Sequence, residues 1–241
     1  MTIVGLGPHG ERASPPERVT LLPQDIETAR TKKLRVAIVM HTVTSDWAKH
    51  LVQGIVGLLG ECGAIVIEVV DCAFSSDVQI AALNRLCEEA PDAIISLPVD
   101  NTTVADAHRA ISRAGIKLVL IDNVPTGMLP GKDYVSLVSA DNYGLGKIAA
   151  ELLSSHLPQN STAGLLGYDA DFFAANEREI AFIHWMEINR PDVTIKTARF
   201  ASIEHAGKDA ERLIDDTLGI SGLFVVWDTP CVDVIRKLSK R

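Results

Sequence analysis

The sequence has no long hydrophobic run and no excess of basic charge, and each absence excludes a class of protein. No stretch of about 18 consecutive apolar residues occurs, so the sequence predicts no membrane-spanning helix. The formal net charge is −8, from 31 acidic and 23 basic residues. Because a protein that binds a nucleic-acid backbone needs a basic face, this charge argues against that function.

Cysteine and histidine are too few and too scattered to indicate a metal site. None of the four cysteines, Cys62, Cys72, Cys87 and Cys231, makes a C-x-x-C pair, and the seven histidines lack the spacing of metal ligands. The four thiols could form two disulfides in an oxidising compartment. A chain of 241 residues can bury a core without such cross-links, so we interpret them as buried thiols.

The sequence also lacks the motifs of common nucleophilic and phosphate-binding enzymes. It has no G-x-S-x-G elbow, no G-x-x-x-x-G-K-S/T loop and no Ser/His/Asp set within one predicted loop. Gly144 and Gly146 resemble part of a phosphate loop, but they fall in the first turns of a predicted helix. Close packing of that helix explains them better. We therefore expect a protein that is not an enzyme and that uses no cofactor.

The first 33 residues contain a second apparent motif. Gly5, Gly7 and Gly10 spell G-x-G-x-x-G, which is typical of dinucleotide binding when it joins a strand to a helix. Here the preceding strand would be only three residues long, and Pro8 and Pro15 would interrupt the loop and the helix. We interpret residues 1–33 as a flexible tail with a short helix at residues 25–32.

From Leu34 onward, apolar runs alternate with amphipathic segments. Strands are predicted at residues 34–40, 64–70, 92–97, 116–121 and 134–138, with helices at 47–62, 77–90 and 101–114. Strands that alternate with helices form βαβ units and a parallel sheet that is covered on both faces. Residues 34–140 therefore predict a first α/β lobe.

The same alternation restarts at residue 141 and predicts a second α/β lobe, residues 141–241. Its strands are predicted at 163–168, 193–200 and 223–227, with helices at 142–156, up to about 189, 204–218 and 230–240. The expected fold class is α/β, with two Rossmann-like lobes that each hold a parallel sheet. The second lobe is expected to be incomplete, because the sequence ends after its third strand.

Acidic, amide and aromatic side chains follow most of the predicted strands. In open parallel sheets, residues just past the carboxyl ends of strands line the ligand crevice. Carboxylates, amides and arginine can each hold two neighbouring hydroxyl groups, and aromatic rings offer flat faces to the C–H side of a sugar ring. This mixture favours a neutral polyol over a phosphate. The alternative for any one Asp or Asn is that it only caps the following helix.

At these residues the chain resembles type I periplasmic binding proteins, above all the ribose-type substrate-binding subunits of sugar ABC importers. More distantly it is similar to the effector domains of LacI-type repressors. The resemblance runs from about residue 34 to residue 241. Its strongest matches are the segments PDAIISLPVD, GIKLVLIDNVP, DYVSLVSADNYGLGKIAAELL, DADFFAANERE and VVWDTP.

The resemblance implies a clamshell of two lobes that closes over one small sugar, such as a pentose. It assigns Asp122 and Arg178 as holders of sugar hydroxyls, Asn142 and Asp228 as further polar contacts, and Trp47 and Phe172 as stacking walls. Three further residues are expected near the ligand, namely Asp46, Asn123 and Asn176.

The resemblance also implies a monomer that delivers its sugar to a membrane permease from the periplasm or cell envelope, with no nucleic-acid partner. Two departures qualify this expectation. Family members continue for roughly 100 more residues, so this chain is expected to be C-terminally truncated and to bind sugar poorly or not at all. No export signal precedes residue 34.

Two other functions are weighed against sugar import. A ligand-sensing domain of a LacI-type regulator would need a basic helix-turn-helix ahead of residue 34, and residues 1–33 are too short and too rich in Pro and Gly. A Rossmann-like enzyme would need a glycine-rich turn after the first strand, where the sequence reads HTVTSDW. The sequence therefore favours the binding protein.

Overall fold

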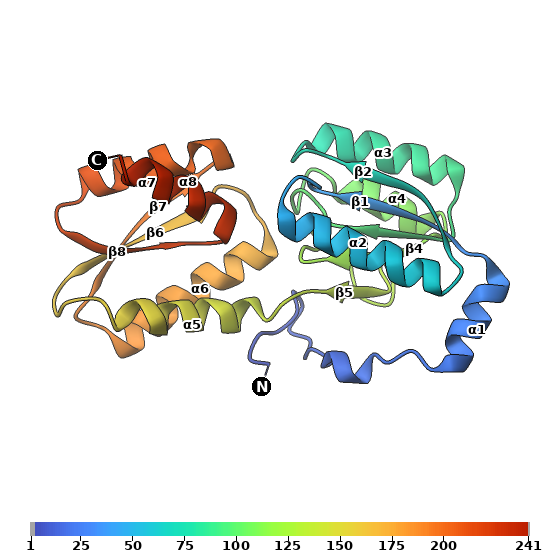
Figure 1. Cartoon of the computed structure of the whole chain (residues 1–241), viewed down its shortest axis with the longest axis horizontal. Helices are drawn as coiled ribbons and strands as arrows, with labels where there is room; N and C mark the ends of the chain where they lie inside the picture. The colour runs from blue at the N-terminus through green and yellow to red at the C-terminus, as the bar shows by residue number, and fades with distance from the viewer. Residues whose placement is uncertain (1–2, 241) are drawn as a thin grey trace. The chain divides into compact units, whose positions relative to one another are not determined.

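The protein folds into two compact α/β units. The computed structural model describes residues 3–240, and one unit is Pro8–Ala140, called here the N-terminal lobe. The other is Asp141–Arg241 with Met1–Gly7, called the C-terminal lobe. Each lobe contains one parallel sheet with helices packed against it (Figure 1), so the predicted fold class is confirmed.

The N-terminal lobe holds a five-stranded sheet with the order β2-β1-β3-β4-β5, in which every pair of neighbours is parallel. Its strands are β1 (Arg35–Met40), β2 (Ile65–Asp71), β3 (Ala93–Ser96), β4 (Lys117–Ile121) and β5 (Ser136–Val138). Its helices are α1 (Pro23–Lys32), α2 (Asp46–Glu61), α3 (Ser76–Glu89) and α4 (Ala105–Arg113), and the short 3-10 helix η1 spans Pro16–Arg18.

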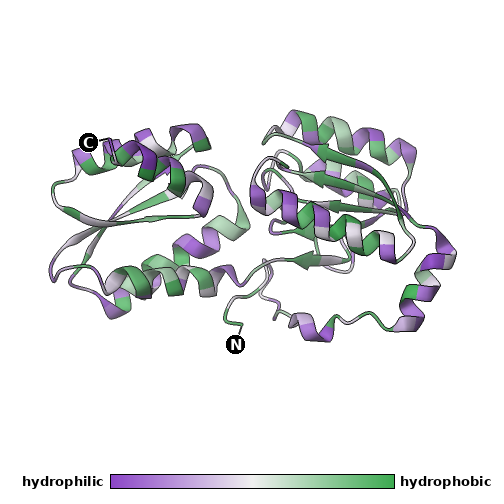
Figure 2. Cartoon of the chain, in the orientation of Figure 1, coloured by the Kyte–Doolittle hydropathy of each residue, from purple (hydrophilic) through white to green (hydrophobic). Residues whose placement is uncertain are grey.

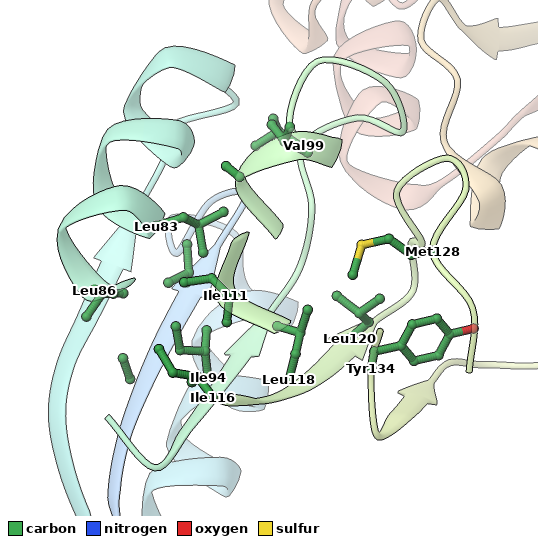
Figure 3. Packing of buried hydrophobic residues seen from close by; sticks show 14 of the residues in the cluster. Leu83, Leu86, Ile94, Val99, Ile111, Ile116, Leu118, Leu120, Met128 and Tyr134 are labelled. Carbon is green, nitrogen blue, oxygen red and sulfur yellow. The ribbon is translucent and has the colours of Figure 1, made fainter. Parts of the chain in front are cut away.

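The apolar run of β1 explains why this sheet is covered on both faces. Successive side chains of a strand point to opposite faces, and all of Val36 to Met40 is buried. Ala37 and Val39 join a cluster with residues of α3 and α4, such as Leu83 and Ile111. Figure 3 shows side chains of this cluster gathered around Leu118 and Leu120 of β4. Figure 2 shows the hydrophobic character of the strands and the hydrophilic character of α1.

The C-terminal lobe holds a three-stranded parallel sheet with the order β7-β6-β8. Its strands are β6 (Thr162–Tyr168), β7 (Thr194–Phe200) and β8 (Ile220–Val225). Its helices are α5 (Asn142–Ser154), α6 (Phe173–Asn189), α7 (Ala206–Asp216) and α8 (Asp228–Leu238), with the 3-10 helix η2 at Ile203–His205. Helices α5 and α6 pack together, as do α7 and α8.

Alternating residues of β6 divide the core of the C-terminal lobe in two. Ala163 and Leu165 pack with Phe182 and Met186 of α6. Leu166 lies in a separate cluster with Ala210 of α7, on the side of α7 and α8. The two-residue period of the strand therefore sends its side chains into both layers of helices.

Two elements, α4 and β8, begin three or more residues away from their predicted starts. Helix α4 begins at Ala105 rather than at residue 101, because the Asp100 carboxylate accepts the N–H groups of Thr102 and Thr103 and holds a turn there. Strand β8 begins and ends earlier than predicted. Its apolar run continues into Trp227, but Trp227 is already the N-cap residue of α8.

The N-terminal segment makes specific contacts. The Asp141 carboxylate accepts the N–H groups of Val4 and Gly5, each at 2.8 Å, and a side chain at Gly5 would overlap that carboxylate. Arg30 of α1 donates its Nε–H to the Glu61 carbonyl. Gly5 of the apparent dinucleotide motif is therefore explained by its close backbone contact with Asp141.

Two sequence expectations concern buried thiols and membrane spans. The four cysteines are unpaired, and burial is complete for Cys72 but partial for the other three, so the expectation of buried thiols holds fully at one position. None of the helices within residues 3–240 combines the length and apolar content that a membrane crossing requires.

Candidate functional site

Two predicted site residues, Asn142 and Arg178, bond to each other near the starts of α5 and α6 in the C-terminal lobe. Arg178 donates its Nε–H to the Asn142 side-chain oxygen at 2.9 Å and its Nη1–H to the Val226 carbonyl at 3.2 Å. Asn142 is buried, with 3% of its surface exposed. One arginine thus joins three elements, α5, α6 and the end of β8, and its guanidinium has a fixed direction.

Gly146 allows this arrangement. A Cβ atom at Gly146 would overlap the backbone carbonyl of Arg178 and crowd the Ala181 side chain, so only glycine lets α5 approach α6 so closely. The prediction that close packing explains this glycine is therefore confirmed. The close contact of α5 with α6 is therefore made at the backbone of Arg178 itself.

Arg178 also lines a pocket of about 280 Å³ within the C-terminal lobe. Trp227 and Asp228, at the start of α8, share its wall, and the rest of the lining is Leu145, Ala149, Phe224, Val225, Val226 and Cys231. The Asp228 carboxylate accepts the N–H of Thr229 at 2.7 Å. Charged groups at the rim of an apolar hollow are typical of small-ligand sites.

Phe172 and Asn176 lie together at the N-terminus of α6. Phe172 is the N-cap residue and packs, half-buried, against the same core cluster as Trp227. Asn176 donates its amide N–H to the Asp171 carboxylate at 2.8 Å. The structure thus gives Asn176 a role in the loop that precedes α6.

Glu179 was not among the predicted site residues, although it is the neighbour of Arg178. Its carboxylate is buried, accepts the N–H of Tyr168 at 3.2 Å and pairs with Arg199 of β7 at 2.8 Å. Burial raises the pKa of Glu179, and Arg199 opposes that shift. This pair ties α6 to β6 and β7 and so helps to position Arg178. A sequence signal existed, because Glu179 lies within the family-like segment DADFFAANERE.

In the N-terminal lobe, Asp122 and Asn123 follow β4 as predicted. Asp122 has a left-handed backbone, with φ of 54°, which is uncommon outside glycine and often marks functional positions. Its carboxylate accepts the hydroxyl of Ser139 at 2.7 Å. Asn123 is fully buried and donates to the Pro98 carbonyl at 3.3 Å, so it connects the turn after β4 to the loop after β3.

Asp46 and Trp47 begin α2, after the end of β1. The preceding Ser45 caps this helix by accepting the N–H of Ala48 at 3.2 Å. The Asp46 carboxylate is 91% exposed and pairs with Lys49 at 3.3 Å. Trp47 is 46% exposed, and its ring lies edge-on to His41 with the centroids 6.3 Å apart.

The structure therefore brings some predicted residues into contact and separates others. Asn142 and Arg178 are bonded to each other, and Arg178 and Asp228 line one pocket. In the N-terminal lobe, β3 lies between β1, which precedes Trp47, and β4, which precedes Asp122. Among residues 3–240, no three His, Cys, Asp or Glu side chains lie where they could hold a metal ion.

Comparison with known proteins gives a family match over most of the chain. The model of a family described as "Periplasmic binding protein domain" matches residues 36–241. No curated protein matches the sequence.

Several solved structures share the fold. The periplasmic component of an ABC-type sugar transport system from Hahella chejuensis is 20% identical, with a TM-score of 0.77 over 86% of this chain and 75% of that one. A solute-binding protein from Agrobacterium vitis, bound with α-D-tagatopyranose, is 20% identical with a TM-score of 0.78, over 86% and 72%. A carbohydrate-transporter protein from Agrobacterium radiobacter, in complex with D-arabinose, is 16% identical with a TM-score of 0.76, over 86% and 72%.

Proposed function

We infer that this chain, which belongs to the periplasmic binding protein domain family, captures a small sugar for an ABC importer. The observation that carries the inference is the Asn142–Arg178 pair beside the pocket that also holds Trp227 and Asp228. A fixed guanidinium, a carboxylate and an indole ring are the groups that a small polyol with one apolar face requires.

The chemistry of the strand ends favours a neutral ligand over a phosphorylated one. Phosphate sites in α/β folds use glycine-rich loops whose backbone N–H groups face the anion. Here the glycine at position 146 is needed for contact between α5 and α6. The side chains that bond to each other across these two helices are one guanidinium and one amide. We therefore propose a pentose or a similar small sugar as the ligand.

The N-terminal lobe supplies two further groups in this proposal. Asp122, on its left-handed turn after β4, would accept hydrogen bonds from sugar hydroxyls. Trp47 offers a half-exposed ring for stacking. Asp46, Phe172, Asn176 and Asp228 would add contacts or hold the loops in place, whereas the burial of Asn123 favours a supporting role.

The proposed role is binding and delivery rather than catalysis or gene regulation. The family is one of solute-binding proteins, and the matched structures are described as components of transporters. This supports an importer component over the alternative of a ligand-sensing domain of a LacI-type regulator. A membrane permease is then the partner, and the periplasm or cell envelope is the place of action.

Calorimetric titration of the whole chain with a panel of pentoses, hexoses and polyols tests the proposal. Although a truncated chain was expected to bind poorly or not at all, the Asn142–Arg178 pair and its pocket lie within this chain, so we expect saturable binding of at least one sugar. Arg178→Ala should lose at least about tenfold in affinity, because a hydrogen bond to a charged group contributes about 1.5–3 kcal/mol. Arg212→Ala, which removes an exposed arginine of α7, is the matched control and should bind normally. Absence of binding by every sugar would contradict the function, whereas equal affinity in Arg178→Ala would remove only Arg178 from the site.

A further inference from the structure

The carboxylate of Asp141 holds two segments that lie far apart in the sequence. Asp141 is the N-cap residue of α5, and its side chain accepts the N–H of Gly144 at 2.9 Å. It also accepts the N–H groups of Val4 and Gly5, each at 2.8 Å. An N-cap side chain ordinarily serves its own helix. Here both oxygen atoms are engaged, because Val4 bonds to Oδ2 while Gly5 and Gly144 bond to Oδ1.

Glycine on each side of the carboxylate makes room for this contact. A Cβ atom at Gly5 would lie 2.7 Å from Oδ1 of Asp141, and one at Gly144 would lie 2.5 Å from Oδ2. Both distances are well below van der Waals contact, so a side chain at either position would displace the carboxylate. The N-terminal segment and the first turn of α5 therefore fit closely around one side chain.

The charge of Asp141 suits both contacts. Burial raises the pKa of its carboxyl, but the N–H groups of Val4, Gly144 and Gly5 together lower that pKa below its ordinary value. A negative charge at the start of a helix also interacts favourably with the partial positive charge of the helix N-terminus. The N-terminal segment therefore binds the same ionised form of Asp141 that caps α5.

The N-terminal segment is fixed again a few residues later. His9 donates its Nε2–H to the carbonyl of Met128 at 2.8 Å. The Met128 side chain is fully buried in the core of the N-terminal lobe, so this carbonyl has a fixed position. Residues 3–9, called here the N-terminal strap, are therefore bonded to Asp141 near one end and to Met128 at the other.

The first turns of α5 connect Asp141 to the candidate site. Asn142, the next residue, accepts the Nε–H of Arg178, and one turn later Gly146 packs against the Arg178 backbone. Movement of the α5 N-terminus therefore disturbs both contacts at once. Without the strap, the Asp141 side chain keeps its bond within α5 but loses the two bonds that fix it from outside the helix.

We propose that Asp141 is a positioning residue of the candidate site and that the N-terminal strap controls ligand affinity through it. The bound strap keeps the Asn142–Arg178 pair in place for a sugar, and release of the strap lowers the affinity. This inference rests on the proposed function, and it gives residues 3–9 a regulatory role. The expected change in affinity is about fivefold, the lower end of typical couplings between two sites.

Substitutions at position 4 test the strap without changing α5. Val4→Pro removes the N–H that bonds to Asp141, whereas Val4→Ala, the matched control, keeps that N–H and only shortens an exposed side chain. Amide hydrogen exchange without sugar should become about tenfold faster at Gly144 and Leu145 in Val4→Pro, in line with the loss of one hydrogen bond to a charged group. Calorimetry with the sugar that binds best should then show about fivefold weaker binding in Val4→Pro and parent-like binding in Val4→Ala.

Asp141→Asn removes the same bond from the other side. Asparagine caps helices as well as aspartate does, so α5 keeps its cap, but the amide lacks the second oxygen that accepts the Val4 N–H. The double variant Val4→Pro/Asp141→Asn should therefore lose about as much affinity as either single variant. Losses that add would show two independent effects and would overturn the role of Asp141. Thermal unfolding of each variant shows that it is folded.

The outcomes separate this inference from the proposed function. If exchange at the start of α5 is unchanged in Val4→Pro, the strap does not hold the helix and the inference is wrong, whatever sugars bind. If exchange becomes faster but the affinity is unchanged, control of the ligand is overturned and sugar binding stands. If the parent chain binds no sugar, the proposed function and the effect on affinity are both overturned. Faster exchange with weaker binding in Val4→Pro, and neither change in Val4→Ala, supports the inference.

Discussion

The two lobes share one folding pattern but use the polar residues at their strand ends differently. In the C-terminal lobe, Arg178 and Asn142 bond to each other, and Arg178 lines a pocket with Asp228. In the N-terminal lobe, Asp100 stabilises a backbone turn and Asn123 is buried beneath the strand ends. Similar residues after similar strands thus line a pocket in one lobe and hold loops in the other.

The difference between the lobes shows that a polar residue after a strand must be held in position by its neighbours before it can bind a ligand. Arg178 is held in place because the close contact at Gly146 and the Glu179–Arg199 pair both fix its helix. The N-terminal lobe instead leaves ring surface exposed and surrounds it with satisfied polar groups. The role of a polar residue after a strand therefore depends on how neighbouring helices and strands position it, and not on its residue type alone.

Acid should destabilise the N-terminal lobe most, and this is the largest effect we expect. His41 and His108 each have a folded-state pKa of about 4, lowered by burial from the usual value of 6.5. The unfolded chain takes up protons first, so stability is complete above about pH 6.5 and is lost as the pH falls toward about 4. The loss approaches about 3 kcal/mol for each histidine.

The C-terminal lobe should respond to the same acidification in the opposite direction at Glu179. Burial raises the pKa of Glu179, so its contribution is greatest at low pH and declines as the pH rises through the folded-state pKa. Amide hydrogen exchange between pH 7 and pH 4.5, converted to opening free energies for each lobe, measures both effects. The double variant His41→Gln/His108→Gln should reduce the pH dependence of the opening free energy in the N-terminal lobe. An unchanged pH dependence would show that these two histidines do not cause it.

Two Gly→Ala substitutions, one in each lobe, compare the packing of the lobes and should change stability less than acid does. Gly146→Ala should lower the free energy of unfolding by about 1–3 kcal/mol, because the added methyl group overlaps the Arg178 backbone. It should also weaken sugar binding by displacing the guanidinium. Gly57→Ala, in α2 of the N-terminal lobe, meets no atom within 4 Å and should raise stability by about 0.5–1 kcal/mol.

Urea denaturation and calorimetry together measure this pair. Gly146→Ala that is as stable as the parent would show that α5 and α6 do not depend on their close contact. Gly146→Ala that loses stability but keeps full sugar affinity would separate the packing from the position of Arg178.

Most of the fold could be predicted from the alternation of apolar and amphipathic segments. The predicted strands of both lobes are present, because a parallel sheet covered on both faces requires continuous apolar runs such as that of β1. The boundaries of α4 and β8 could not be predicted. Helix α4 begins late because the Asp100 side chain accepts a backbone N–H in the turn before it. Strand β8 ends early because α8 begins at Asp228. Neither cause can be recognised from hydrophobicity.

The arrangement of the candidate site was harder to predict from the sequence than the fold. The proximity of Asn142 and Arg178 depends on the packing of α5 against α6, which the glycine at position 146 indicated. The burial of Asn123 and the left-handed turn at Asp122 depend on contacts with distant loops.

A double-mutant cycle on Asn142 and Arg178 tests the central claim most directly. The affinities of the parent chain, Asn142→Ala, Arg178→Ala and the double variant are measured by calorimetry with the sugar that binds best. If the two side chains recognise the sugar as one unit, the double variant should lose about as much affinity as Arg178→Ala alone. Losses that simply add would contradict the account, because they would show that the two residues act on the ligand independently.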